Sequence, residues 1–355
     1  MGRKNRNNRL GRWLAVGLGL ALSLQAGGAH PEARNAPHGS LSKTPLSPAR
    51  EDLLQKGIAD LRAKRYGEAR QAFRSMVDKD QGDHEALFHL GESYFLEGDF
   101  SASIEWWEKA VRFQPGSSLY HYWLARANEA RFQKAGLLSK MKYGKRFRDE
   151  IQLAVRLDGN NLDARFWLMV FYLTSPRSFG GDIAKGLGQA EAIKKIDLAY
   201  GYHAYITAYL RGKRFDLVEK ELLRRVESFP DRIDYKLDLS WFYLDQKDYP
   251  RAIQNSRLIA ENHPEAALAL FQIGRAAAES DTQLDLAKRC LVQYVADVTS
   301  ANRPHLEWAH FYLGRILALE GDTDLARGEY ASALRIVPGF KPAADALKNL
   351  SKRRS

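Results

Sequence analysis

Cysteine is almost absent from this chain, since Cys290 is the only one among 355 residues. A single thiol excludes an intramolecular disulfide and any zinc site built on several cysteines. The sequence also lacks the nucleotide-binding motifs G-x-x-x-x-G-K-[ST] and G-x-G-x-x-G, the hydrolase motif G-x-S-x-G and the metalloprotease motif H-E-x-x-H. We therefore expect no enzymatic activity, no cofactor and no metal site.

Apolar runs long enough to cross a bilayer are lacking as well. The apolar run Trp13–Leu24 has 12 residues, whereas a membrane-spanning helix needs about 20. Residues 1–29 contain five basic residues and no acidic one, and small residues follow the apolar run at Ala26–Ala29. This order is typical of a secretory signal peptide, so we predict export with cleavage after Ala29. The location would be periplasmic in a Gram-negative source; an uncleaved signal that tethers the protein to the inner membrane is the alternative.

The excess of positive charge outside the N-terminal segment is smaller than the net charge of +11 suggests. Five of the positive charges lie in the predicted signal peptide, which leaves +6 for the rest of the chain. We therefore predict no nucleic-acid binding. Residues 131–148 are an exception, because this stretch has seven basic residues and no acidic one. We expect these residues to lie in an insertion between two helices, as a solvated helix face or as a weak contact for an anionic surface.

A repeated pattern fills most of the chain after residue 49. Residues 30–49 contain four prolines and are predicted to be a flexible linker. From His84 onward, Leu87, Leu90, Gly91 and Tyr94 lie on one face of a predicted helix. A Gly-Asp turn follows at 98–99, and a second helix carries Ser103, Trp107 and Ala110 on one face before Pro115 ends it.

The same spacing recurs at intervals near 34 residues. We place units at starts near 50, 84, 118, 162, 199, 233, 267 and 307, so that the array covers residues 50–340. Residues 341–355 then form a capping helix and a basic tail. The pattern L-x2-L-G-x2-Y…S-x3-W…P resembles the tetratricopeptide repeat, W-x2-L-G-x2-Y…A-x3-F…P. The resemblance implies an all-α, right-handed solenoid of about eight antiparallel helix pairs.

The resemblance also implies a function. In such repeats the first helices line a concave groove, and the family generally binds proteins there. We expect a non-catalytic scaffold in the cell envelope that holds an extended peptide or a helix. Helical spacing directs aromatic and charged side chains of the first helices toward this groove. The candidate residues are Phe88, Glu92, Tyr122, Arg126, Trp241, Phe271, Arg275, Trp308, Phe311 and Arg315.

Three alternatives remain open at this point. Trp241, Trp308 and Phe311 could stack on sugar rings in a carbohydrate-binding or exopolysaccharide-export accessory protein. An enzyme could use an acid in the loop 174–182, with Asp182 as the candidate. His89 and Glu92 are three residues apart on one helix and His121 lies one unit later, as metal ligands could, but both histidines fall near the packing face, which favours a structural role.

Overall fold

The computed structural model describes residues 48–296 and 304–352. The predicted signal peptide and nearly all of the predicted linker lie outside these residues. Every regular element in the described part is a helix, and the chain divides into two compact units between Lys213 and Arg214. None of the described helices is long and apolar enough to span a membrane.

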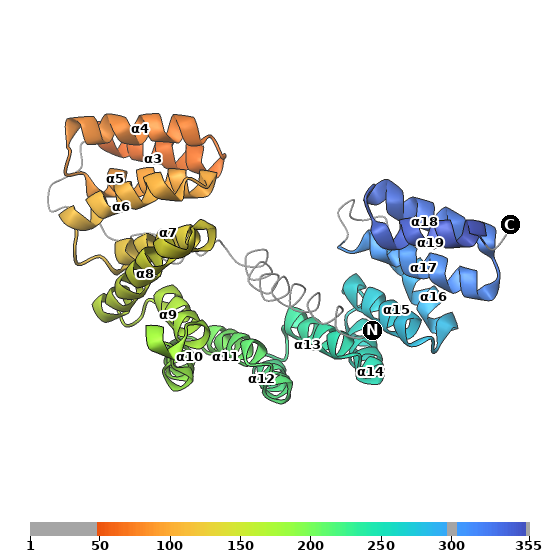
Figure 1. Ribbon diagram of the computed structural model, residues 1–355. Helices are drawn as coiled ribbons and strands as arrows, with labels where there is room; N and C mark the ends of the chain where they lie inside the picture. Colours follow the sequence, from red (N-terminus) through yellow and green to blue (C-terminus); the bar gives the residue numbers. More distant parts are fainter. Residues whose placement is uncertain (1–47, 297–303, 353–355) are drawn as a thin grey trace. The chain divides into compact units, whose positions relative to one another are not determined.

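Unit 1 contains helices α3 to α11, which follow one another in chain order (Figure 1). Their bounds are α3 Pro48–Arg62, α4 Tyr66–Lys79, α5 His84–Glu97, α6 Phe100–Phe113, α7 Ser118–Lys134, α8 Leu137–Leu157, α9 Leu162–Thr174, α10 Ile183–Ile196 and α11 Leu198–Arg211. A short 3₁₀ helix, η1 Arg177–Phe179, lies between α9 and α10.

Unit 2 contains helices α12 to α19. Their bounds are α12 Phe215–Ser228, α13 Ile233–Gln246, α14 Tyr249–Asn262, α15 Ala267–Ser280, α16 Leu284–Ala296, α17 Leu306–Glu320, α18 Thr323–Ile336 and α19 Lys341–Lys352. Each helix packs mainly against its neighbours in the sequence, which is the contact pattern of a repeat stack. The structure thus confirms the all-α solenoid predicted from the sequence.

Polar residues at the helix starts explain why the chain breaks into these short helices. The side chains of Asp83, Asp99, Ser117, Asn161 and Asp248 each accept a hydrogen bond from a backbone N–H in the first turn of the following helix. Such caps satisfy donors that have no partner inside the helix.

In most pairs the turn after the first helix contains a residue in the left-handed conformation. Gly98 and Gly321 occupy this position in two pairs, with φ of 90° and 91°. In other pairs a residue with a side chain takes it, namely Lys64, Lys213, Lys247 and Asp281, all with positive φ.

A close approach between paired helices accounts for the glycine of the repeat pattern. The ring of Trp107 on α6 lies so near Gly91 on α5 that an added Cβ would fall 2.4 Å from it. The Trp107 indole N–H donates a hydrogen bond of 2.8 Å to the backbone oxygen of Phe88. The same exclusion recurs at Gly57, Gly274 and Gly314, which face Phe73, Leu291 and Tyr330. In these four pairs the second helix therefore inserts one large side chain into the space that the glycine of the first helix leaves open.

The third pair departs from the expected insertion. Residues 131–148 do not form a loop between helices, because α7 and α8 are separated only by Ala135 and Gly136. The extra residues lengthen the helices to 17 and 21 residues, compared with 14 each for α5 and α6. No proline interrupts residues 137–157, and Gly144 lets the rings of Phe132 and Phe179 approach closely.

Candidate functional site

The first helices of unit 2 form its inner face. Helix α13 contacts α15 directly, and α15 contacts α17, whereas the second helices α14, α16 and α18 are less closely joined to one another. A stack whose first helices lie closer together curves toward them, so α13, α15 and α17 line the concave side of unit 2.

Aromatic rings on these helices form a continuous cluster. The ring of Phe271 on α15 lies 5.9 Å from that of Trp241 on α13, and it contacts Tyr312 on α17 at 6.5 Å. His305, which immediately precedes α17, stacks on Phe271 at 5.3 Å and meets Trp241 edge-on at 5.2 Å. Burial among these rings lowers the pKa of His305, and the charge of Arg275 lowers it further. The lowered pKa favours the uncharged form of the imidazole beside these rings.

The arginine at the centre of this face is already paired. Arg275 Nε donates to Glu279 Oε1 at 3.0 Å, and the guanidinium lies 5.4 Å from the centre of the Trp241 ring. The hydroxyl of Tyr312 donates to the same carboxylate, and that of Tyr249 reaches its other oxygen at 3.4 Å. Burial acts to lower the pKa of Arg275, but the neighbouring Tyr312 and Glu279 outweigh it and raise the pKa. The guanidinium is thus held in place as part of the surface.

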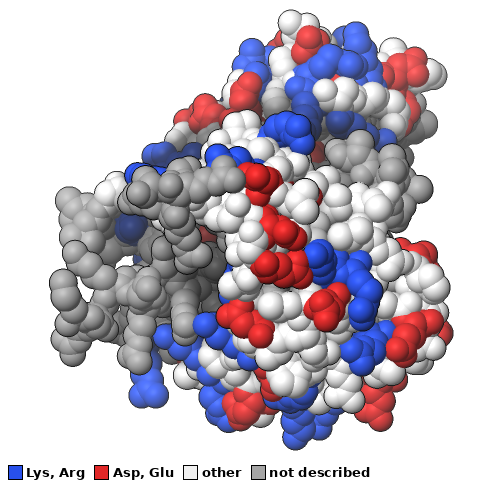
Figure 2. All heavy atoms as spheres, turned by 90° about the vertical axis from the view of Figure 1, so that its right-hand side faces the viewer, with Lys and Arg blue, Asp and Glu red and all other residues white. Residues whose placement is uncertain are grey.

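The second predicted arginine is paired in the same way. Arg315 Nη2 lies 2.7 Å from Asp281 Oδ1, and both side chains remain in contact with solvent. Figure 2 draws the side of the molecule that is on the right in Figure 1, where acidic and basic side chains are interspersed among wide uncharged areas. The inner face of unit 2 therefore offers aromatic surface next to charges that already neutralise one another.

Trp308 and Phe311 lie at the C-terminal end of this face, where residues beyond α18 support them. Trp308 meets Phe340 edge-on at 4.8 Å and stacks on Tyr312 at 5.9 Å, while Phe311 contacts Phe340 at 6.0 Å and Tyr330 at 5.9 Å. Both side chains are half-buried, as is Trp241. Each exposes part of a rigid ring whose orientation is fixed by packing.

Three predicted groove residues lie inside the helix packing instead of on the surface. Phe88, Tyr122 and Phe271 are only 5%, 7% and 1% exposed. Phe88 stacks on Tyr120 of the next first helix at 4.9 Å. Adjacent first helices cover these rings, so they pack beneath the surface and are not available to a partner.

The other predicted residues of unit 1 have partners within the unit. Glu92 bonds through Oε2 to His89 Nδ1 at 2.7 Å. The guanidinium of Arg126 lies 3.5 Å from the centre of the Trp167 ring, and its Nη1 is 3.8 Å from Glu129. Both side chains are half-buried.

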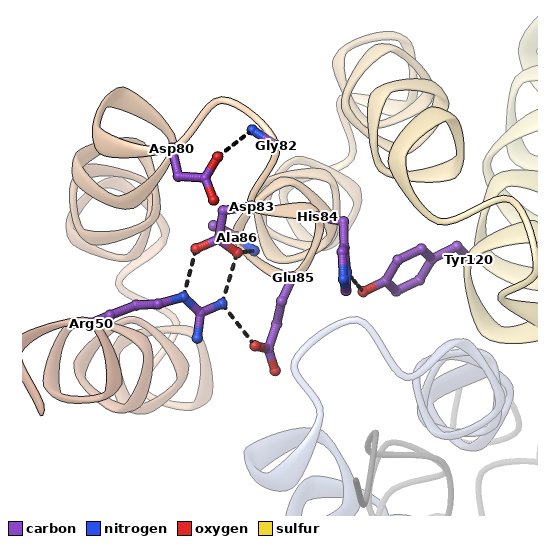
Figure 3. Close-up of polar contacts among 8 residues, drawn as sticks. All are labelled: Arg50, Asp80, Gly82, Asp83, His84, Glu85, Ala86 and Tyr120. Carbon is purple, nitrogen blue, oxygen red and sulfur yellow. Dashed lines mark hydrogen bonds and ion pairs between the residues drawn. The ribbon is translucent and has the colours of Figure 1, made fainter. Parts of the chain in front are cut away.

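A polar cluster in unit 1 that the repeat pattern does not reveal joins the first helices α3, α5 and α7 (Figure 3). Arg50 donates to both carboxylate oxygens of Asp83 at 2.8 Å and to Glu85 at 3.0 Å. The hydrogen bond to Asp83 raises the pKa of Arg50 above its usual value. His84 and Tyr120 approach at 2.9 Å on the other side of α5. The sequence does contain a signal for this cluster: Arg50 and Asp83 carry opposite charges and are 33 residues apart, which is about one repeat.

The residues of the alternative hypotheses have structural partners. Asp182 accepts a hydrogen bond from the backbone N–H of Lys185 at 3.0 Å and so caps α10. His121 bonds to Glu150 and to the backbone oxygen of Pro115. Among the described residues, no group of three or more His, Cys, Asp or Glu side chains is placed to hold a metal ion.

Stacked helix pairs of this kind define a helical-repeat protein. Residues 54–118 match the family model described as tetratricopeptide repeat. No curated protein matches the sequence. The match identifies the tetratricopeptide repeat in residues 54–118, which form helix pairs of the same kind as the rest of the stack.

Three solved structures resemble this chain, and that of yeast Tom70 supports the same fold over nearly its whole length. The structure of yeast Tom70 is 16% identical with a TM-score of 0.55, over 98% of this chain and 80% of that one. A TPR protein of Thermus thermophilus is 17% identical with a TM-score of 0.44, over 55% of this chain and 99% of that one. A tetratricopeptide repeat protein from Parabacteroides merdae is 9% identical with a TM-score of 0.46, over 76% of this chain and 100% of that one.

Proposed function

We propose that this protein is a non-catalytic scaffold that holds a segment of another protein on the inner face of unit 2. Proteins built from tetratricopeptide repeats generally act as protein-interaction scaffolds. The observation that carries the proposal is a set of half-buried rings on the concave side of α13 and α17, namely Trp241, Trp308 and Phe311. Rigid aromatic side chains lose little conformational entropy on binding and dominate binding hot spots.

The charges of this face indicate what kind of segment it accepts. Arg275 and Arg315 already bind Glu279 and Asp281, so an acidic peptide would have to displace internal ion pairs. An amphipathic helix or an extended peptide that presents apolar side chains fits the exposed rings without that cost. We therefore infer an apolar or amphipathic partner segment.

Photo-crosslinking in living cells tests the binding surface. A photoreactive amino acid at Trp241 is expected to give a discrete protein adduct, which mass spectrometry would identify. The matched control is the same amino acid at Leu258 on α14, which is 54% exposed and lies on a second helix. Adducts of equal yield from both positions, or none from Trp241 in a folded protein, would contradict the proposal.

We further propose that the scaffold acts outside the cytoplasm, in the cell envelope. The support is the basic, apolar and small-residue order of residues 1–29, which lie outside the described part of the chain. Cell fractionation with intact-mass measurement tests this: a mature chain that begins at His30 is expected. A chain that retains Trp13 would refute cleavage, and a purely cytoplasmic chain would refute export.

A further inference from the structure

The hairpin of α7 and α8 extends beyond the other helix pairs of unit 1. Buried Ile151 and Ala154 on α8 take the places that Trp107 and Ala110 take on α6. This alignment leaves residues 137–143 as two additional turns at the start of α8, a length of about 10 Å at 1.5 Å per residue. Residues 132–134 extend α7 beside them. We call residues 132–143 the hairpin tip.

The tip and the turn after it carry unneutralised positive charge. Residues 131–148 contain seven basic residues and no acidic one. Two of the arginines pair with carboxylates elsewhere, Arg146 with Glu108 at 2.7 Å and Arg148 with Asp149 at 2.9 Å. The four lysines of this stretch, by contrast, form no ion pair within the described chain. They are Lys134, Lys140, Lys142 and Lys145.

An apolar side chain stands among these lysines. Met141 is 67% exposed, although methionine is usually buried. Lys142 follows it directly, and Lys145, four residues after Met141, lies one helical turn further on the same face, because residues four apart on a helix are neighbours. Both lysines are exposed. The opposite side of α8 packs inward through Phe147, which is 8% exposed.

We propose that this tip docks the protein on an anionic lipid bilayer. Negative headgroups attract the lysines, and their long apolar stems let the ammonium groups remain at headgroup level while Met141 enters the interface. The start of α8 adds to the attraction, because a helix N-terminus carries a partial positive charge. The lysines are spread over a projecting helix end and pair with no carboxylate in the described part of the chain, an arrangement that suits a layer of anionic headgroups better than a single acidic site on a protein.

Vesicle co-sedimentation tests the charge component. The full chain is mixed with vesicles of phosphatidylcholine alone or with about one third phosphatidylglycerol. Each lysine near such a surface contributes roughly fivefold to affinity, so Lys142→Glu/Lys145→Glu should weaken binding to the anionic vesicles by about tenfold or more. The matched control, Lys56→Glu/Lys79→Glu, makes the same charge change at exposed positions on α3 and α4 and should change it less than twofold.

A fluorescent label tests insertion of the tip itself. Met141→Cys can be labelled selectively, because Cys290 is buried and burial raises the pKa of its thiol. An environment-sensitive dye at position 141 should shift to shorter wavelength on anionic vesicles but not on phosphatidylcholine. The same dye on a Lys56→Cys variant should not shift with either vesicle. Because residues 1–29 are common to all variants, their own affinity for lipid cancels from the comparison.

Two outcomes would overturn the proposal. One is equal loss of vesicle binding in the two double variants with no spectral shift at position 141. The other is a protein adduct from a photoreactive group at position 142 in cells, with vesicle binding unaffected by Lys142→Glu/Lys145→Glu, which would assign the tip to an acidic protein. Circular dichroism of every variant establishes that the helices remain folded.

Discussion

Gly91 is the residue at which the repeat depends most directly on the absence of a side chain. Gly91→Ala would place a Cβ 2.4 Å from the Trp107 ring, so we expect unfolding free energy to fall by about 1–3 kcal/mol. Gly188→Ala on α10 is the control, because no atom lies within 4 Å of the added Cβ. That variant should be stabilised by up to about 1 kcal/mol through helix propensity. Urea denaturation of both variants measures the difference, and a destabilisation of equal size in both would contradict this account.

His121 should make stability depend on pH. Burial acts to lower its pKa, but the hydrogen bonds to Glu150 and to the Pro115 backbone, together with the charge of Glu150, outweigh this and raise the pKa above 6.5. A raised folded-state pKa means that the stabilisation is fully present below about pH 6.5 and is lost as pH rises through the higher folded value. We therefore expect His121→Gln to reduce the unfolding free energy more at about pH 6 than at about pH 8. Denaturation at the two pH values checks this, and a larger loss at the higher pH would refute it.

At single positions, helical spacing predicts the direction of a side chain better than its exposure. Trp241, Trp308 and Phe311 were predicted on the inner side of the first helices, and their side chains are half-buried. Phe88 and Phe271 share that spacing and are buried. The spacing determines on which side of its own helix a residue lies. Its burial depends on how closely the first helix of the next repeat approaches. That distance is set by packing across repeats, which no single unit encodes.

At the scale of the element, the sequence predicts helix starts more reliably than helix lengths. Capping residues and glycine turns mark the starts locally. The extra residues of the third unit were expected between its helices, but they extend α7 and α8 instead. A period of about 34 residues reveals only that residues are added. Whether they form a loop or further helical turns depends on the packing of Phe132, Gly144 and Phe179.

Helix α19 ends the stack and should stabilise unit 2. Its buried Ala343 and Leu350 form a cluster with Phe340, Tyr330 and Leu317. Removing residues 341–355 should lower the unfolding free energy of unit 2 by about 2–4 kcal/mol, because this apolar surface returns to water. Deletion of residues 353–355 alone keeps α19 and should have little effect. Calorimetry of both truncations measures the loss, and equal transition temperatures would exclude a capping role.

At the scale of the whole molecule, the repeat period sufficed to predict the fold class. A regular interval with alternating turn signals has few structural solutions other than stacked helix pairs. The division between Lys213 and Arg214 was not predicted. It falls inside the unit that starts near residue 199, where the sequence pattern continues without a linker. A boundary of this kind depends on which helices contact one another, and the sequence of one repeat carries no signal for it.

The left-handed turn residues are positions at which substitution by glycine could raise the stability of the protein. Lys64, Lys213 and Lys247 adopt a backbone conformation that costs a residue with a side chain about 1 kcal/mol and costs glycine almost nothing. After allowance for the greater freedom of glycine in the unfolded chain, each Lys→Gly change should still raise the unfolding free energy by about 0.5 kcal/mol. Lys220→Gly, within α12, should instead be destabilising. Thermal denaturation of the triple variant measures the sum, and a lower midpoint than that of the parent would refute it.

Asp281 is best left unchanged, because its carboxylate binds Arg315. Substitutions in the turns between helices could thus raise the thermal stability of the protein without altering any residue of the inner face or of the hairpin tip.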